Sequence, residues 1–246
     1  MEQSAAKSEI AERLRKDILS LEGFHAPSDG QQKRFGLGEI EKSFPNGVFP
    51  TGAVHEFTSL ADQDAASTCG FMAGLLGKLM HQKGPCLWIS MDRMIFPPAL
   101  KFFGVEPDRV IFIDIKKKQD LLWAIEESLK CEAISAVVGE ISEITLTESR
   151  RLQLAVEQSR VTGFLHRPNP RHANTLASVS RWKITPIPSQ LEPGMPGVGH
   201  PRWNVQLLKV RNGEPGEWNI EWSEGDFHLV PEQAAVVVRE GLQKVG

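Results

Sequence analysis

Residues 133–167, AISAVVGEISEITLTESRRLQLAVEQSRVTGFLHR, follow the pattern of a strand, a helix and a second strand. The segment 133–141 is almost wholly apolar, which is typical of a strand buried on both faces of a parallel sheet. Thr145-Leu146-Thr147-Glu148 is a capping box, which predicts that a helix begins there. The segment 162–167 predicts the next strand. Because parallel strands need a long crossover connection, this succession predicts a parallel sheet covered by helices.

The same alternation continues towards the N-terminus. Short, mostly apolar strands are predicted at 53–57, 85–90 and 109–115, and amphipathic segments follow them. This pattern indicates an α/β protein whose sheet is covered on both faces. The predicted helices run from about Ala66 to Gln82, from Pro97 and from Asp120.

A different pattern begins near Ser180. The segments 180–187, 202–212 and 217–222 are longer and alternate between apolar and polar residues, which is typical of antiparallel strands. Asn212-Gly213-Glu214-Pro215-Gly216 predicts a turn between the last two. We therefore expect an α/β fold with a mostly parallel sheet, helices on both faces and a C-terminal antiparallel β-hairpin extension.

The residues before this body predict an amphipathic helix joined by a linker. In the helix, apolar residues recur at spacings of three and four, and such a stripe must be buried on the chain itself or on a neighbour. We predict that it docks on a partner or on a second copy. The stripe consists of Ile10, Leu14, Ile18 and Leu21. The predicted parts are a helix over 1–22, a linker over 23–43, a core domain over 44–230 and a tail over 231–246, which could form a short helix.

Composition narrows the class of protein. Of the 246 residues, 41% are hydrophobic and 24% are charged, so the chain is expected to fold. No apolar run approaches the roughly 18 residues of a membrane helix, and the N-terminus has no apolar secretory segment, so we expect neither a membrane protein nor a secreted one. Three cysteines without a CxxC pattern predict a reducing environment, and therefore a cytoplasmic protein. The seven histidines show no metal-ligand spacing.

The charge is unevenly distributed along the chain. Between Gln158 and Gly213 lie eight basic residues and one acidic residue, which gives +7, although the whole chain carries −3. Such a segment predicts a local anionic partner, and weak contact with single-stranded DNA is one possibility; a solvated basic surface is the alternative. The candidate contacts to DNA or to a partner are Arg167, Arg171, Arg181, Lys209 and Arg211.

The segment 58–68, TSLADQDAAST, stands where a phosphate-binding loop would lie in such a fold. It has no glycine and no lysine, and it carries Asp62 and Asp64, which would repel a triphosphate. We therefore expect a degenerate, vestigial nucleotide site, no cofactor and no enzymatic activity. The candidate residues of this site are Ser67 and Thr68, which could cap the helix or hold a metal, and Asp92 and Glu140, which follow or end strands.

The order of these parts resembles the RecA core. On this resemblance Asp92 takes the place of the water-activating glutamate, and Glu140 takes the place of the Walker B aspartate. TGFLHR resembles the last parallel strand. Lys209 and Arg211 fall where RecA has two lysines that reach the nucleotide of the neighbouring subunit. The phosphate-loop lysine is the main departure from the pattern.

Within that superfamily the chain is similar to the ImuA family. The resemblance extends over about residues 44–222 and includes FPTGAVHEF, LLWAIEESLKCEAISAVVGEI and PRWNVQLLKVRNGEPGEWNIEW. It implies a damage-inducible accessory protein of bacterial translesion synthesis (SOS mutagenesis). The implied partners are ImuB, a polymerase-like protein, and an error-prone replicative-type DNA polymerase, with RecA as a further candidate. The alternatives are a RecA-type ATPase with a degenerate phosphate loop and a SulA-like cell-division inhibitor.

Overall fold

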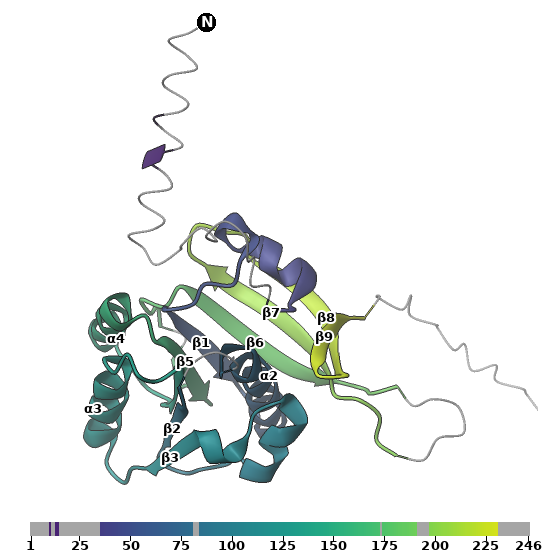
Figure 1. Cartoon of the computed structure of the whole chain (residues 1–246), viewed down its shortest axis with the longest axis horizontal. Coiled ribbons are helices and arrows are strands. Elements are labelled where there is room, and N and C mark those ends of the chain that lie inside the picture. The colour runs from purple at the N-terminus through teal and green to yellow at the C-terminus, as the bar shows by residue number, and fades with distance from the viewer. Residues whose placement is uncertain are drawn as a thin grey trace, which may run out of the picture.

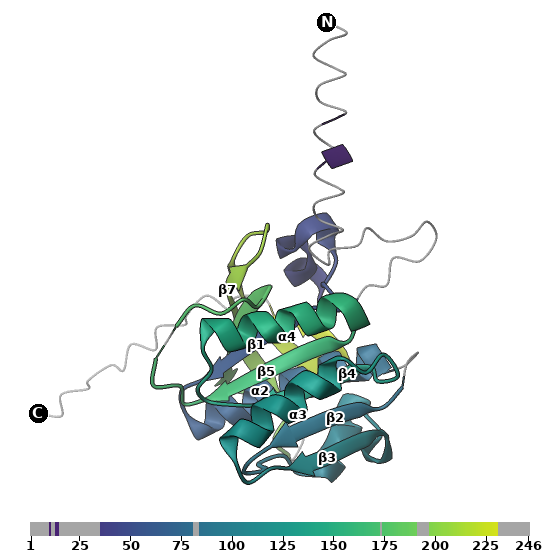
Figure 2. The same cartoon turned by 90° about the vertical axis from the view of Figure 1, so that its left-hand side faces the viewer.

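The computed structural model describes residues 10, 13–14, 35–80, 84–172, 174–190 and 197–230. Within these residues, nine strands form one sheet in the order β3-β2-β4-β5-β1-β6-β7-β8-β9 (Figures 1 and 2). The strands from β3 to β6 in this order are parallel, and β7, β8 and β9 are antiparallel to their neighbours. The strands are β1 Val54–Ser59, β2 Cys86–Ser90, β3 Val110–Asp114, β4 Ala136–Glu140, β5 Thr162–Pro168, β6 Ser180–Ile187, β7 Arg202–Val210, β8 Gly216–Ser223 and β9 Asp226–Leu229.

Helices cover both faces of the sheet, which confirms the predicted fold class. The helix α2 (Asp62–Met80) lies on one face, and α3 (Lys118–Leu129) and α4 (Leu146–Ser159) lie on the other (Figure 2). Successive strand residues point to opposite faces, so Val138 packs in the core beneath α2, and Val137 packs in the core beneath α3 and α4. The short 3-10 helices are η1 Gly38–Ser43, η2 Pro45–Gly47, η3 Pro97–Phe103 and η4 Pro107–Arg109.

The strand β6 differs from the prediction. It was expected to belong to the antiparallel extension, but it pairs in parallel with β1 and antiparallel with β7. The strand that contains TGFLHR is therefore followed by a further parallel strand. The expectation that TGFLHR forms the last parallel strand was wrong. From Ser180 to Thr185, residues of β6 alternate between buried and half-buried, and the buried Trp182 and Ile184 belong to the core beneath α2. Alternation in the sequence therefore did not distinguish the two kinds of pairing.

The segment predicted as a linker up to residue 43 belongs partly to the body. Phe35, Leu37 and Ile40 are at most 7% exposed and pack in the same core as side chains of α2 and β7. The 3-10 helix η1 also contacts β8 and β9 (Figure 1). The packed body therefore includes residues 35–43, which were predicted to belong to the linker.

Much of the predicted N-terminal helix and all of the C-terminal tail lie outside the described residues. Ile10, Arg13 and Leu14 are helical, and the side chains of Ile10 and Leu14 are 60% and 55% exposed. Ile18, Leu21 and residues 231–246 are not among the residues described. In the described part of the chain, no helix combines the length and the apolar character that are needed to cross a membrane.

Candidate functional site

The connection between β1 and α2 is too short for a phosphate-binding loop. The strand ends at Ser59 and the helix begins at Asp62, so Leu60 and Ala61 form the whole connection. A phosphate loop needs about eight residues, whose backbone amides surround the phosphate groups. The predicted start of this helix near Ala66 was too late by one turn, because Asp62 and Asp64 begin the helix instead of extending the loop. Acidic residues in a first turn are stabilised by the helix dipole.

Ser67 and Thr68 consequently lie inside α2, and neither caps it. The Ser67 hydroxyl donates to the carbonyl oxygen of Gln63 at 3.0 Å, one turn earlier. Thr68 is fully buried, and its hydroxyl lies 2.9 Å from that of Ser59 at the end of β1. The prediction that these residues cap the helix was wrong, because the helix starts before them.

Glu140 and His166 lie side by side at the carboxyl ends of β4 and β5. They are partners in the parallel register, and both side chains lie on the α2 side of the sheet. Nε1 of Trp88 donates to Oε1 of Glu140 at 2.7 Å, and Nε2 of His166 lies 3.0 Å from the hydroxyl oxygen of Ser59. Cys69 of α2 completes the group: one donor atom each from Cys69, Glu140 and His166 all lie within 4.8 Å of one another.

Burial determines the protonation of this group. Burial raises the pKa of the Glu140 carboxyl, although the hydrogen bond from Trp88 opposes that shift. Burial lowers the pKa of His166 to about 4, so its imidazole is neutral at pH 7. Burial, together with the charge of Glu140, raises the pKa of the Cys69 thiol. A neutral imidazole and an apolar surrounding do not favour the binding of an anion such as a nucleotide phosphate.

A cavity of about 560 Å³ opens next to this group. Its walls are mostly apolar and come from α2, from the segment that leads into η3, and from the region between β6 and β7. Ser67 and Glu140 both line it, so the structure brings together two residues of the predicted nucleotide site. A smaller cavity of about 310 Å³ is lined by the exposed Asp92 and by Glu140. Thr68 is not among the residues that line either cavity.

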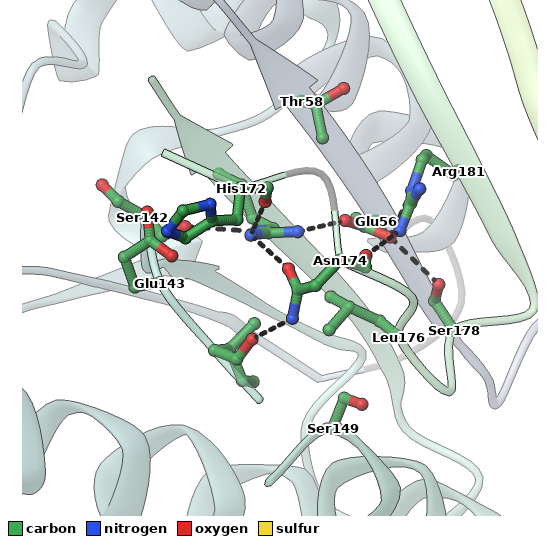
Figure 3. Close-up of polar contacts among 12 residues, drawn as sticks. Glu56, Thr58, Ser142, Glu143, Ser149, His172, Asn174, Leu176, Ser178 and Arg181 are labelled. Atoms are coloured by element: carbon green, nitrogen blue, oxygen red, sulfur yellow. Dashed lines mark hydrogen bonds and ion pairs between the residues drawn. The ribbon is translucent and has the colours of Figure 1, made fainter. Parts of the chain in front are cut away.

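On the opposite face of the sheet, a buried ion-pair cluster joins β1, β5 and β6 (Figure 3). Glu56 accepts from Nη1 of Arg167 at 2.7 Å and from Nε of Arg181 at 2.8 Å. Nη2 of Arg167 also donates to the side-chain oxygen of Asn174 at 2.9 Å and to the carbonyl oxygen of His172 at 3.1 Å. The cluster therefore links the segment that follows β5 to the middle of β1.

This cluster overturns the prediction that Arg167 contacts DNA. The Arg167 side chain is 0% exposed and is paired with Glu56, so it offers no surface to a phosphate. The Arg181 side chain is 18% exposed, and its guanidinium pairs with Glu56 and bonds to the carbonyl oxygen of Asn174. Instead of facing a partner, these two arginines bond to His172 and Asn174 in the segment after β5.

Of the other predicted contact residues, Lys209 and Arg211 bond to backbone carbonyl oxygens of the chain itself, whereas Arg171 is exposed. Nζ of Lys209 donates to the carbonyl oxygens of Leu176 and Ser178 at 2.8 and 3.0 Å, and Nη2 of Arg211 donates to that of Ala177 at 2.9 Å. Burial lowers the pKa of Lys209, and the charges of Arg181 and Arg211 lower it further. Arg171, in contrast, is exposed, and its backbone amide donates to Glu143.

Sequence reasoning missed Glu56, Cys69 and His166. Glu56 carried a signal, since a carboxylate inside a buried strand requires a cationic partner. The partners themselves could not be identified, because Arg167 and Arg181 are 111 and 125 residues away in the sequence. Cys69 and His166 lie 97 positions apart by number and carry no local spacing signal.

The fold and the site together define an α/β protein in which the phosphate-loop position is replaced by a two-residue connection. No model of a protein family matches the chain. Protein ImuA of Caulobacter vibrioides strain NA1000 is 35% identical to it over 217 residues, which cover 81% of this chain and 89% of that protein. Protein ImuA of Caulobacter vibrioides strain CB 15 matches with the same identity and coverage. The chain belongs to the ImuA family.

Proposed function

We propose that the chain is a non-catalytic accessory protein of DNA damage-induced mutagenesis that acts as an adaptor in translesion synthesis. Membership in the ImuA family is the observation that carries the proposal. The proposed partners are an ImuB-like protein and an error-prone replicative-type DNA polymerase, with RecA as a further candidate. The order of strands and helices is compatible with the RecA-like core that the sequence resembles.

The geometry at the end of β1 supports a non-catalytic role. The two-residue connection supplies no amide cradle, and Asp62 and Asp64 lie in the first turn of α2. A triphosphate there would lack charge-assisted hydrogen bonds worth about 1.5–3 kcal/mol each. Calorimetry with ATP and magnesium is expected to show no binding tighter than about 100 μM. Micromolar affinity, or ATP turnover stimulated by single-stranded DNA, would instead support the RecA-type ATPase.

Exposed apolar side chains between β2 and η3 support an adaptor role. Met94 and Phe96 are 61% and 68% exposed, and both line the larger cavity. Met91, directly after β2, is 41% exposed, and Phe102, inside η3, is 53% exposed. Several large exposed apolar side chains within a short segment are typical of a site of protein association. We assign this segment to the ImuB-like partner.

A complementation experiment tests the proposal. Deleting the gene from its host should reduce the frequency of mutations induced by ultraviolet light, and the full chain should restore it. A SulA-like inhibitor would instead cause filamentous cells when it is overproduced. Restoration that fails, or filamentation without any effect on mutagenesis, would contradict the proposal.

The partner surface is tested by co-purification with the ImuB-like protein. The double variant Met94→Ser/Phe96→Ser should lose most of the co-purified partner, whereas its melting temperature should stay unchanged. Leu154→Ser on α4 is the matched control, because Leu154 is 60% exposed on the opposite side of the sheet. Equal recovery of the partner by all three proteins would rule out this segment as the contact.

A further inference from the structure

Two buried polar atoms near the ends of the parallel strands have no hydrogen-bond partner among the described residues. They are Nδ1 of His166 on β5 and Oγ of Ser90 on β2. Glu140 ends β4, which lies between these two strands. A buried donor or acceptor without a partner is costly, so most such atoms in folded proteins are satisfied by protein, water or a ligand. The two atoms therefore point to a ligand beside Glu140.

Three donors of different chemistry converge at this place. Cys69 offers a sulfur, His166 a ring nitrogen and Glu140 a carboxylate oxygen, all within 4.8 Å of one another. Around a tetrahedral zinc ion with bonds of 2.0–2.3 Å, donor atoms lie about 3.5 Å apart. The three side chains would therefore move together by about 1 Å, which small side-chain rotations supply.

Outer contacts already orient two of these donors. Nε2 of His166 lies 3.0 Å from the hydroxyl oxygen of Ser59, so a proton on Nε2 leaves the lone pair of Nδ1 free. Trp88 donates to Oε1 of Glu140 at 2.7 Å and leaves Oε2 free. Metal-binding histidines and carboxylates are commonly held by such second hydrogen bonds, which fix the tautomer and the orientation of the ligand.

We propose that Cys69, Glu140 and His166 bind one divalent transition-metal ion of the zinc type, with a fourth coordination position open to the apolar cavity. Thiolate, imidazole and carboxylate are the ligands of zinc, and sites with three protein ligands keep one position for water or another ligand. The same three residues line the cavity of about 560 Å³, so a donor atom of a bound molecule could reach the ion from there. The accessory role in mutagenesis does not require this site, so the two proposals can fail separately.

Cobalt and zinc binding to the purified full chain test the site. After treatment with a chelator, the chain should bind one equivalent of Zn²⁺ with a dissociation constant below about 10 μM. Co²⁺ should produce the near-ultraviolet absorption of a thiolate–cobalt bond, which only coordination by cysteine explains. Zinc at about 100 times its dissociation constant should raise the melting temperature by roughly 5–10 °C.

Matched variants assign the ligands. Cys69→Ser should lose the cobalt–thiolate absorption, and His166→Gln should weaken zinc binding at least tenfold. The exposed Cys131 and His172 provide the controls, and Cys131→Ser and His172→Gln should bind as the parent does. Circular dichroism of each stripped variant confirms that it is folded. A parent chain that binds zinc more weakly than about 10 μM, or that gives no thiolate absorption with cobalt, overturns the proposal, whatever the variants do.

Discussion

At the scale of single residues, the buried ion pair of Glu56 and Arg167 is expected to affect the stability of the fold. Arg167 has no exposed surface, and Glu56 is the carboxylate that balances its charge. Removing one partner of a buried ion pair typically costs about 3–5 kcal/mol, because the other charge stays buried. We expect Glu56→Gln to lower the free energy of unfolding by that amount in urea.

The exposed Arg171 provides the control for this prediction. Arg171→Ala removes an exposed charge from the segment that follows β5, four residues after Arg167, and should change the free energy of unfolding by less than about 0.5 kcal/mol. A Glu56→Gln variant as stable as the parent would mean that the buried arginines are compensated mainly by the carbonyl and amide oxygens around them.

The buried His55 is expected to make the free energy of unfolding depend on pH. It is fully buried, hydrogen-bonded to the Ser180 hydroxyl and the Pro50 carbonyl, and burial lowers its pKa from 6.5 to about 4. The unfolded chain therefore binds a proton at a higher pH than the folded chain, so the contribution of His55 is complete above pH 6.5 and is lost as the pH falls towards 4. That loss is on the order of 3 kcal/mol over the window.

Urea unfolding at pH 7 and at pH 5 measures the larger part of this loss, about 2 kcal/mol. His166 adds to it in the same direction, since burial also lowers its pKa to about 4, whereas the raised pKa of Glu140 acts in the opposite direction. His55→Gln should reduce the difference between the two pH values, and the exposed His228→Gln should not. The same pH dependence in His55→Gln as in the parent would assign the effect to other groups.

The basic segment should contact single-stranded DNA weakly, and through few residues. Arg160 and Arg171 are exposed, whereas Arg167 is buried. Each phosphate that is neutralised contributes about −0.7 to the log–log salt slope, so two contacts predict a slope near −1.4. Arg171→Ala should reduce that slope by about 0.7 in fluorescence anisotropy titrations, and Lys101→Ala on η3 should leave it unchanged. A slope that Arg171→Ala does not alter would show that this loop is merely solvated.

At the scale of elements, the glycines of α2 determine how closely the sheet and η3 approach the helix. A Cβ at Gly74 would lie 2.6 Å from the ring of Phe227 and 2.9 Å from that of Trp222. Alanine favours a helix by about 1 kcal/mol over glycine, but overpacking a core typically costs 1–3 kcal/mol. We expect Gly74→Ala to lower the free energy of unfolding by about 1–2 kcal/mol in urea. Gln63 is exposed on the same helix, so the control variant Gln63→Ala should change the free energy of unfolding by less than about 0.5 kcal/mol. A Gly74→Ala variant that is more stable than the parent would mean that the rings of Phe227 and Trp222 move aside.

The elements that were predicted correctly carry local signals. The capping box at Thr145 and Glu148 is formed in the structure, and the apolar runs at 85–90 and 133–141 coincide with β2 and β4. The 3-10 helix η1 and the four-residue strand β9 were missed. Apolar residues at Phe35, Leu37 and Ile40 fit neither the helical nor the strand period, so only contacts with distant residues show that they are buried.

At the scale of the whole molecule, the site depends on how the sheet is ordered. Adjacent residues of β5 serve two different clusters, because His166 points to the α2 face and Arg167 points to the opposite face. The sequence could predict that polar residues end the parallel strands, as it did for Glu140. It could not predict which strands are neighbours, and the order β4-β5-β1-β6 is what brings Glu56 to Arg181 and Glu140 to His166.

The boundary of the folded body gives the last prediction. Phe35, Leu37 and Ile40 are buried, and each such side chain contributes about 1.5–3 kcal/mol on burial, so together they approach the total stability of an ordinary domain. Deleting residues 1–30 should therefore leave the melting temperature unchanged, whereas deleting residues 1–43 should leave the chain unfolded or aggregated.

The shorter deletion also removes Ile10 and Leu14, whose exposed helical side chains are predicted to dock on a partner or a second copy. Association measured by analytical ultracentrifugation should therefore weaken. If the shorter deletion lowers the melting temperature and leaves association unchanged, the N-terminal helix packs on its own body. If both deletions melt as the parent does, the segment from Phe35 to Ser43 contributes nothing to the core.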